Sequence, residues 1–179
     1  MKSLSLAAMS LSALLLGVGA ATAQQPAAPA ANPLDTIPDA MPFNIPYGAP
    51  ISLERAQAAV SAAQAEAAKR GWPMNIAVYD SGANLVTFSR MDGAALASIA
   101  IAEHKARVSV KFRRPSKAFE DGVQKLDYKY LMTLDDAIAS RGGIPLIEGG
   151  KLIGAIGCSG ATGSQDEVVC QAGAATVNK

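Results

Sequence analysis

The feature that most restricts the fold of this chain is a hairpin signal near its C-terminal end. The run IPLIEGGKLIGAIGCSG, residues 144–160, places two apolar segments around Glu148, Gly149 and Gly150. Glycine readily adopts the positive φ angles of tight hairpin turns, so the two segments are expected to pair as antiparallel strands. The rest of the chain must then supply the elements that bury this sheet.

Segments with strand and helical patterns alternate along the rest of the domain. Residues 74–80 and 84–90 flank a Ser-Gly-Ala turn and predict a second hairpin. Helical patterns cover residues 53–70, 95–112, 116–125 and 164–176. We therefore predict an α+β domain, an antiparallel sheet of about five strands with helices packed on it. The fifth strand requires part of residues 127–143, otherwise expected to be a loop with short turns, to be extended.

The first 23 residues have the organisation of a signal peptide. Lys2 precedes an apolar run at residues 11–18, and ATA at residues 21–23 offers the small side chains that a signal peptidase accepts. The apolar run is too short to span the roughly 30 Å hydrocarbon core of a membrane. We therefore expect cleavage after Ala23, no stable membrane insertion, and a periplasmic or secreted mature protein.

Residues 24–50 form a separate segment that is rich in proline and alanine. Its seven prolines exclude a regular helix or a central strand, so we interpret it as a linker or a surface arm. Phe43, Ile45 and Tyr47 make its second half apolar enough to dock on the domain or on a neighbouring molecule. The domain itself is expected to span residues 51–179.

The charge of the mature chain is balanced. Removal of Lys2 from the 16 Lys and Arg residues makes their number equal to that of the 15 Asp and Glu residues. A neutral domain gives no support for binding nucleic acid or an anionic membrane surface.

The glycine-rich stretch GCSGATGSQDEVVCQAG, residues 157–173, contains both cysteines of the chain, Cys158 and Cys170. In an exported protein they form either a disulfide or two buried free thiols, and their spacing fits no zinc pattern. The stretch lacks the Lys-Ser/Thr of a P-loop, and Asp166 and Glu167 would repel an added anion. We therefore reject phosphate binding here and expect the stretch to form one wall of a pocket.

His104 is the only imidazole in the chain and lies in the second predicted helix. Helical spacing places it on one face with Ile101, Val108 and Phe112. Such a histidine is either a core or interface residue or the axial ligand of a haem iron, which a neutral imidazole with apolar neighbours suits. The residues alone leave both interpretations open.

A run of basic residues accompanies His104, and a solvated helix face explains most of them. Its members are Lys105, Arg107, Lys111, Arg113, Arg114 and Lys117. A local cluster in a neutral domain is also suited to receive carboxylates such as haem propionates, for which arginine is well matched. Arg113 and Arg114, just before Pro115, are the best-placed pair.

Arg90 and Asp92 lie between the first hairpin and the second helix, in SRMDGAAL at residues 89–96. Asp92 is expected to accept hydrogen bonds in a turn or helix cap. Arg90 leaves a strand end, where its side chain is able to face a pocket.

Three blocks of the sequence occur in an order found in one family. They read PMNIAVYDSGANLVTFSRMDGA, IAEHKARVSVKFRRPS and GGIPLIEGGKLIGAIGCSGATGSQDEVVCQAG. Together they resemble the GlcG/HbpS-like haem-binding family over about residues 51–177. The resemblance implies a profilin-like α+β fold and assembly into homo-oligomers, often octamers. For exported members it implies haem or iron binding, with haem degradation or redox sensing beside a sensor kinase in some.

The sequence departs from the family pattern at two positions. Val108 stands where the family often has a threonine that is a candidate haem contact, and valine cannot ligate iron. The resemblance therefore implies that ligation shifts to His104 or is absent. Cys158 replaces a usual aliphatic residue, which is consistent with a disulfide to Cys170 in exported relatives.

Three functions are compatible with these residues. The first is an exported haem- or iron-binding protein that assists haem degradation or redox sensing and is a binding protein rather than a turnover enzyme. The second is a periplasmic accessory protein or enzyme for a small organic acid, with a pocket lined by Arg90, Asp92, Lys105 and the 159–167 loop that holds Asp166 and Glu167. The third is a non-catalytic oligomeric module that partners a sensor.

Overall fold

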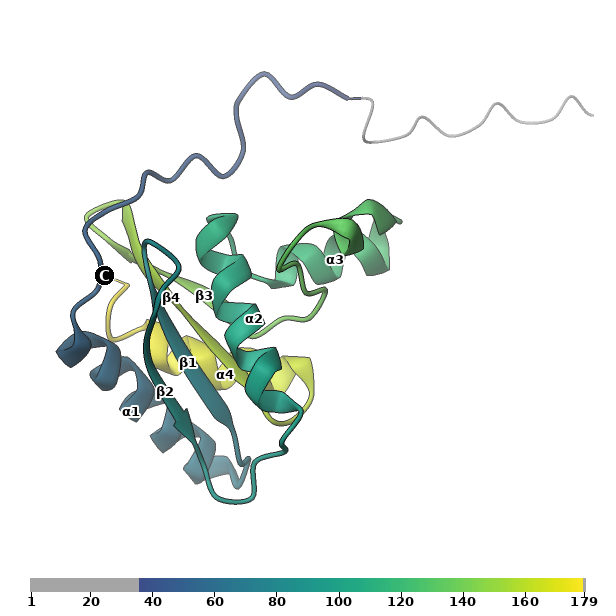
Figure 1. Ribbon diagram of the computed structural model, residues 1–179. Helices are drawn as coiled ribbons and strands as arrows, with labels where there is room; N and C mark the ends of the chain where they lie inside the picture. Colours follow the sequence, from purple (N-terminus) through teal and green to yellow (C-terminus); the bar gives the residue numbers. More distant parts are fainter. Residues whose placement is uncertain (1–35, 179) are drawn as a thin grey trace, which may run out of the picture. The chain divides into compact units, whose positions relative to one another are not determined.

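The structure is a computed structural model that describes residues 36–178. The predicted signal peptide at residues 1–23 and the first part of the predicted arm lie outside the described residues. The helices are α1 (Leu53–Arg70), α2 (Ser98–Lys111), α3 (Lys117–Lys125) and α4 (Gly163–Ala174), with a short 3-10 helix, η2 (Lys129–Thr133) (Figure 1). The strands are β1 (Asn75–Asp80), β2 (Leu85–Arg90), β3 (Gly143–Glu148) and β4 (Lys151–Ser159).

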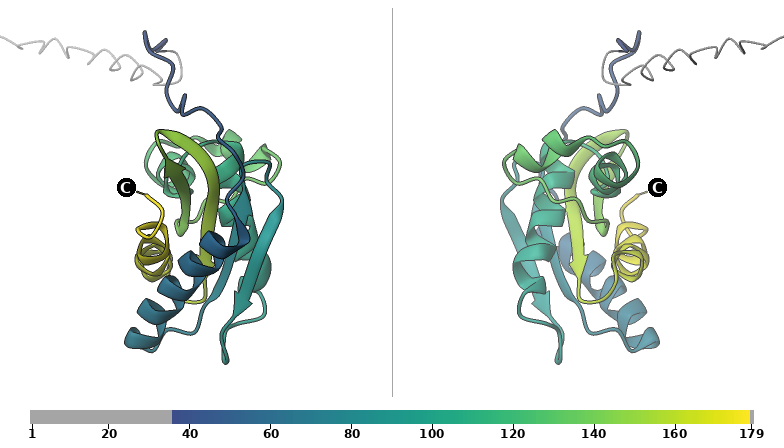
Figure 2. Two further views of the ribbon diagram at one scale, coloured as in Figure 1. Left: turned by 90° about the vertical axis from the view of Figure 1, so that its left-hand side faces the viewer. Right: turned by 90° about the vertical axis from the view of Figure 1, so that its right-hand side faces the viewer.

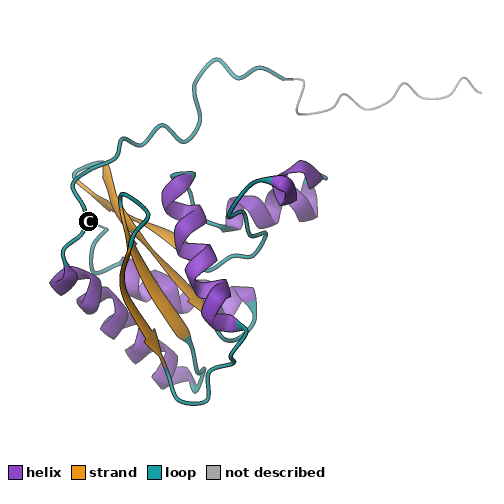
Figure 3. Ribbon diagram, viewed as in Figure 1, coloured by secondary structure: helices purple, strands orange, loops and turns teal. Residues whose placement is uncertain are grey.

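The strands form an antiparallel sheet in the order β2-β1-β4-β3 (Figure 3). The predicted α+β class is confirmed, and both predicted hairpins are present. Within residues 36–178 the sheet has four strands rather than about five, because the 127–142 segment forms η2 and irregular backbone instead of a strand.

The outer edge of β3 shows why no further strand pairs there. The Gly143 amide donates to Ser116 Oγ at 2.8 Å, and the Ser116 amide donates to the Gly143 carbonyl at 3.0 Å. Further along, the Asn178 side chain accepts from the Ile147 amide at 2.7 Å and donates to the Pro145 carbonyl at 3.0 Å. These groups take the hydrogen bonds that a neighbouring strand would need.

Helix ends agree with the local sequence signals. Ser52 Oγ accepts from the Arg55 amide and begins α1, and Gly71, at φ 68°, ends it. Thr162 and Gln165 form a reciprocal capping box that begins α4 at Gly163, one or two residues before the predicted start. None of the helices within residues 36–178 is long and apolar enough to cross a membrane.

Helices cover both faces of the sheet, as Figure 2 shows from two sides. The α1 and α4 helices pack on one face, where Ile76, Val78 and Ile156 are buried. The α2 helix packs on the opposite face, against Ala77 and Ala155. The sheet is thus the middle layer of three.

The close approach of α2 to the sheet depends on two strand glycines. A Cβ atom at Gly157 would lie 2.1 Å from the carbonyl oxygen of Ala102, and one at Gly143 would lie 2.1 Å from that of Lys105. No side chain can occupy either position without moving the helix. These glycines therefore fix the depth at which the α2 side chains enter the domain.

A smaller apolar cluster joins α3 and η2 to α2. Its buried members are Val108, Phe119 and Leu131, and the rings of Phe112 and Phe119 meet edge to face at 4.9 Å between centroids. Sequence spacing grouped His104 with Val108 and Phe112, but only these two pack in the cluster, and His104 is half-buried outside it. Val108 is fully buried in it, so position 108 faces the interior.

Residues 43–51 pack along the sheet and the end of α2. Tyr47 forms a parallel bridge with Leu152, and the Ile51 amide donates to the Ile153 carbonyl at 2.9 Å. The edge of β4 at Leu152 and Ile153 is not paired with β1, because the pairing of β1 with β4 ends at Gly154. The Tyr47 hydroxyl lies 3.1 Å from the carbonyl oxygens of both Val110 and Lys111, in the last turn of α2.

Candidate functional site

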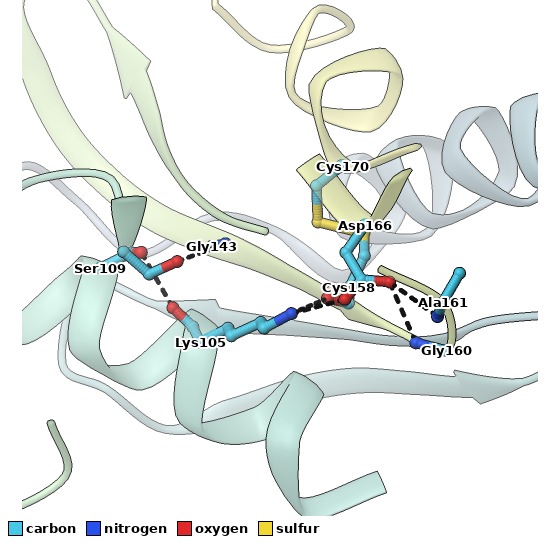
Figure 4. Close-up of a disulfide and its surroundings, with 9 residues drawn as sticks. Lys105, Ser109, Gly143, Cys158, Gly160, Ala161, Asp166 and Cys170 are labelled. Carbon is cyan, nitrogen blue, oxygen red and sulfur yellow. Dashed lines mark hydrogen bonds and ion pairs between the residues drawn. A yellow bond between two sulfur atoms is a disulfide. The ribbon is translucent and has the colours of Figure 1, made fainter. Parts of the chain in front are cut away.

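The most buried charged group of the described chain is Lys105, on the sheet-facing side of α2. Its side chain is 1% exposed, and its Nζ lies 2.7 Å from Asp166 Oδ2 and 3.2 Å from the Cys158 carbonyl oxygen (Figure 4). Asp166 comes from the first turn of α4, on the other face of the sheet. The ion pair therefore connects the two outer layers of the domain at the end of β4.

The carboxylate of Asp166 also organises the glycine-rich loop. Its Oδ1 accepts from the amides of Gly160 at 3.1 Å and Ala161 at 3.0 Å. Burial lowers the pKa of Lys105 and raises the pKa of Asp166, and the attraction between the two groups opposes both changes. Each side chain thus depends on the other to remain charged in the interior.

A disulfide joins Cys158 at the end of β4 to Cys170 in α4, with the two Cα atoms 5.5 Å apart. It closes a loop that contains Asp166 and its two amide donors (Figure 4). Both cysteines are fully buried. The glycine-rich stretch is therefore held by a covalent bond, an ion pair and a capping box, all of which stabilise the fold.

These contacts change the interpretation of two predicted ligand-binding residues. Lys105 is an exception to the solvated helix face expected for the basic run, and Asp166 is 2% exposed. The structure brings the two residues together, but in the interior rather than on a surface. The organic-acid hypothesis placed both in one pocket, but the sequence did not predict a direct ion pair, because they lie 61 positions apart and on different helices.

His104 occupies the outward side of α2, where it is half-buried. The residues before His104 on this side of the helix are apolar, and those after it are basic. Towards the N-terminus Ala97 and Ala100 are exposed, whereas towards the C-terminus Arg107 and Lys111 follow at helical spacing. The imidazole thus lies between an apolar half and a cationic half of one helix face.

Arg107 and Lys111 share one carboxylate, that of Asp136. Arg107 Nε lies 3.3 Å from Asp136 Oδ1, and Lys111 forms an ion pair with Oδ2. Arg107 is also held by the Tyr79 hydroxyl, 3.0 Å from its NH1. The hydrogen bond from Lys111 lowers the pKa of Asp136, and the charge of Arg107 acts in the same direction.

Arg113 and Arg114, predicted as the best-placed anion-binding pair, are both in contact with residues 43–47. Arg113 NH1 donates to the Ile45 carbonyl at 3.2 Å, and the Arg114 guanidinium lies 3.9 Å from the centroid of the Phe43 ring. Burial is the main cause that lowers the pKa of Arg114. The structure therefore places both arginines under the arm, and not beside His104 on the open side of α2.

Within residues 36–178, the side chains of the remaining predicted residues, Arg90, Asp92 and Glu167, form no ion pair with the basic residues of α2. Arg90 and Asp92 are exposed, at the end of β2 and in the turn that follows it. Glu167 lies 3.7 Å from Arg141, which also binds Glu120.

A cavity of about 420 Å³ lies elsewhere, at the β3–β4 turn. Its lining residues are Arg55, Glu148, Gly149, Thr176 and Val177. None of the residues singled out as candidate ligand-binding groups in the sequence lines it. Sequence reasoning missed two contacts of the α2 face, Tyr79 and Asp136. Tyr79 lies in the first family block but was assigned only to a strand, and Asp136 lies outside the three blocks.

Comparison with known proteins finds one family whose model covers most of this domain. A model of the family described as "Haem degrading protein HbpS-like" matches residues 51–175. Protein GlcG of Escherichia coli K12 is 38% identical over 109 residues, which make up 61% of this chain and 81% of GlcG.

Solved structures with the same fold support this assignment. A double mutant of HbpS from Streptomyces reticuli has a TM-score of 0.69 and 28% identity, over 84% of this chain and 100% of that chain. The crystal structure of the PduOC complex with haem has a TM-score of 0.66 and 26% identity, over 72% of this chain and 96% of that chain. The resemblance predicted from the three sequence blocks is confirmed, and the chain belongs to the HbpS-like family.

Proposed function

We propose that this protein binds haem on the outward face of α2, with His104 as the axial ligand of the iron. Haem binding is supported at the family level by the description of the matching family and by the PduOC complex with haem. The observation that carries the proposal for this chain is the position of His104. It is the single histidine of the sequence, it is half-buried, and it lies between apolar and cationic side chains.

The residues on this face fit the chemistry of haem. An imidazole is a common axial ligand of haem iron. The porphyrin ring is apolar and carries carboxylates at one edge, so it matches a surface that changes from Ala97 and Ala100 to Arg107 and Lys111. Haem bound here would be held by His104 at the iron and by Arg107 and Lys111 at its carboxylates, and it would supply a redox-active iron.

Position 108, where the family often has a threonine as a candidate haem contact, cannot ligate iron in this chain. Val108 has no donor atom and is fully buried against Phe119 and Leu131. A ligand on the outward face of α2 therefore meets His104 and not residue 108.

Titration of the purified mature protein with hemin tests this function. Absorption spectra are expected to show a Soret band that saturates at one haem per site, and His104→Ala is expected to weaken binding. Added imidazole should restore the spectrum of the variant, because it replaces the missing ligand without altering the fold. An unchanged hemin spectrum with the wild-type protein would contradict the proposal.

We propose in addition that the protein is exported, in keeping with the signal pattern of residues 1–23, and acts in the periplasm or outside the cell. A homo-oligomer, a sensor-kinase partner and a contribution to haem degradation are further expectations from the family. Mass spectrometry of the mature N-terminus tests export, and sedimentation velocity tests assembly. Chromatography of the bound pigment after incubation with a reductant distinguishes storage of haem from its breakdown.

A pocket for a small organic acid is less well supported. Of the side chains assigned to it, Lys105 and Asp166 are buried against each other, and Arg90 and Asp92 are exposed. None of them lines the cavity at the β3–β4 turn. The open face of α2 therefore remains the better candidate.

A further inference from the structure

Two cations on the outward face of α2 converge on one carboxylate. Arg107 and Lys111 are one helical turn apart, and Asp136 accepts from the first through Oδ1 and from the second through Oδ2. Each Asp136 oxygen thus serves a different cation. This is how a carboxylate bridges two donors in a binding site for an organic anion.

One of the two cations, Arg107, keeps contacts that do not involve Asp136. The Tyr79 hydroxyl lies 3.0 Å from Arg107 NH1, and the Arg107 guanidinium lies 5.5 Å from the centroid of the Tyr79 ring. Glu103, one turn earlier on α2, lies 3.6 Å from the same NH1 atom of Arg107. Arg107 therefore remains oriented when the Asp136 carboxylate withdraws.

Asp136 itself comes from irregular backbone. It follows η2 and precedes β3, it is partly exposed, and it has a positive φ of 60°. Leu134, Ala137 and Ile138 attach this stretch to the α3 cluster, but they are only partly buried. The carboxylate is thus presented to α2 by a segment with no ladder of backbone hydrogen bonds.

We propose that Arg107 and Lys111 form a carboxylate-binding site, that Asp136 is its internal occupant, and that a ligand carboxylate binds by displacing Asp136. The proposal rests on the proposed function, because the ligand class is an apolar ring with peripheral carboxylates that also reaches His104. It assigns to Asp136 the role of a residue that tunes affinity. One carboxylate replaces another, so the charge on the two cations stays compensated throughout.

Asp136→Asn tests this site, and Asp135→Asn is the matched control. Asp135 is the adjacent aspartate and is exposed. Asparagine tolerates a positive φ as well as aspartate does, so the substitution removes the charge without straining the backbone. Hemin and hemin dimethyl ester are titrated in parallel at low ionic strength into the wild-type protein and both variants.

Asp136→Asn is expected to bind hemin about two- to fivefold more tightly than the wild type, the range that a partly exposed ion pair supplies. Asp135→Asn should bind as the wild type does, and the dimethyl ester, which lacks free carboxylates, should show no gain with either variant. Equal or weaker binding of hemin by Asp136→Asn, or an equal gain with the ester, would overturn the role of Asp136. If Asp136→Asn binds hemin no more tightly than the wild type, but the wild type binds hemin, the role of Asp136 is wrong and the proposed function stands. If neither the wild type nor any variant binds hemin, both the role of Asp136 and the proposed function are contradicted.

Discussion

Lys105 Nζ lies 2.7 Å from Asp166 Oδ2, and both side chains are buried where the two helical layers meet the end of β4. The pair connects α2, which carries His104, to α4, which closes the glycine-rich loop. The position of the proposed haem face therefore depends on an interaction on a different side of the same helix.

Removal of one member of this pair is expected to destabilise the protein strongly. Lys105→Met leaves the Asp166 carboxylate buried without a cation, which should lower the free energy of unfolding by about 3 kcal/mol or more. The double variant Lys105→Met/Asp166→Asn should recover part of the loss, because it removes the unpaired charge. Urea denaturation followed by circular dichroism measures these differences.

The matched control for this series is Lys111→Met, on the same helix. The Lys111 side chain is 45% exposed, so its loss should cost about 1 kcal/mol or less. If Lys105→Met and Lys111→Met had equal effects, the buried pair would not be the dominant connection between the layers.

The disulfide between Cys158 and Cys170 is expected to stabilise the domain without being required for its fold. The chain-entropy model assigns about 3 kcal/mol to a loop of this length. Asp166 and the capping box of Thr162 and Gln165 hold the same loop in the reduced protein. Denaturation with and without reductant should show a lower midpoint and an unchanged native far-ultraviolet spectrum, and loss of that spectrum on reduction would contradict this account.

The arm is expected to contribute to the stability of α2. Tyr47→Phe removes a hydroxyl that lies near two carbonyl oxygens in the last turn of the helix, at a cost of about 1 kcal/mol. Tyr130→Phe is a suitable comparison, because Tyr130 is likewise about half exposed. Thermal unfolding of the two variants should differ, and identical midpoints would show that the contact of Tyr47 with α2 adds nothing.

Acid sensitivity is expected from the carboxylates paired in α3. A hydrogen bond from Lys117, with a smaller contribution from Lys125, lowers the pKa of Asp121 from 3.8 to about 2. A lowered pKa in the folded state contributes stability above the unfolded value, and this contribution is lost as the pH falls from about 4 towards 2. Asp121→Asn should flatten the dependence of the unfolding temperature on pH in that window, and a parallel curve for the variant would exclude this role.

Local signals in the sequence were sufficient for most of the fold. Ser52 and Gly71 mark the ends of α1, and Gly149 and Gly150 mark the β3–β4 turn, because these residues act through backbone conformation at their own positions. The expected fifth strand is not part of the described sheet, and the reason lies in residues outside the segment that was expected to form it. Ser116 and Asn178 occupy the outer edge of β3, and no property of the 127–142 segment reveals this.

The candidate site was predictable only in part. His104 was identified because it is the single imidazole, and the family resemblance directed attention to its helix. The pairing of Lys105 with Asp166 and the contact of Asp136 with Arg107 arise from residues distant in the sequence. Helical periodicity gives the direction of each side chain on its own helix, but not the element that it meets.

The single histidine makes the central claim open to one direct measurement. Untagged protein labelled with [15N]histidine is saturated with hemin, and the ferric complex is examined by pulsed electron paramagnetic resonance. Ligation by His104 predicts a hyperfine coupling from one 15N imidazole nitrogen in addition to the unlabelled porphyrin nitrogens. A haem complex without that 15N coupling would show that His104 is not the iron ligand and would contradict the assignment of the site to this face of α2.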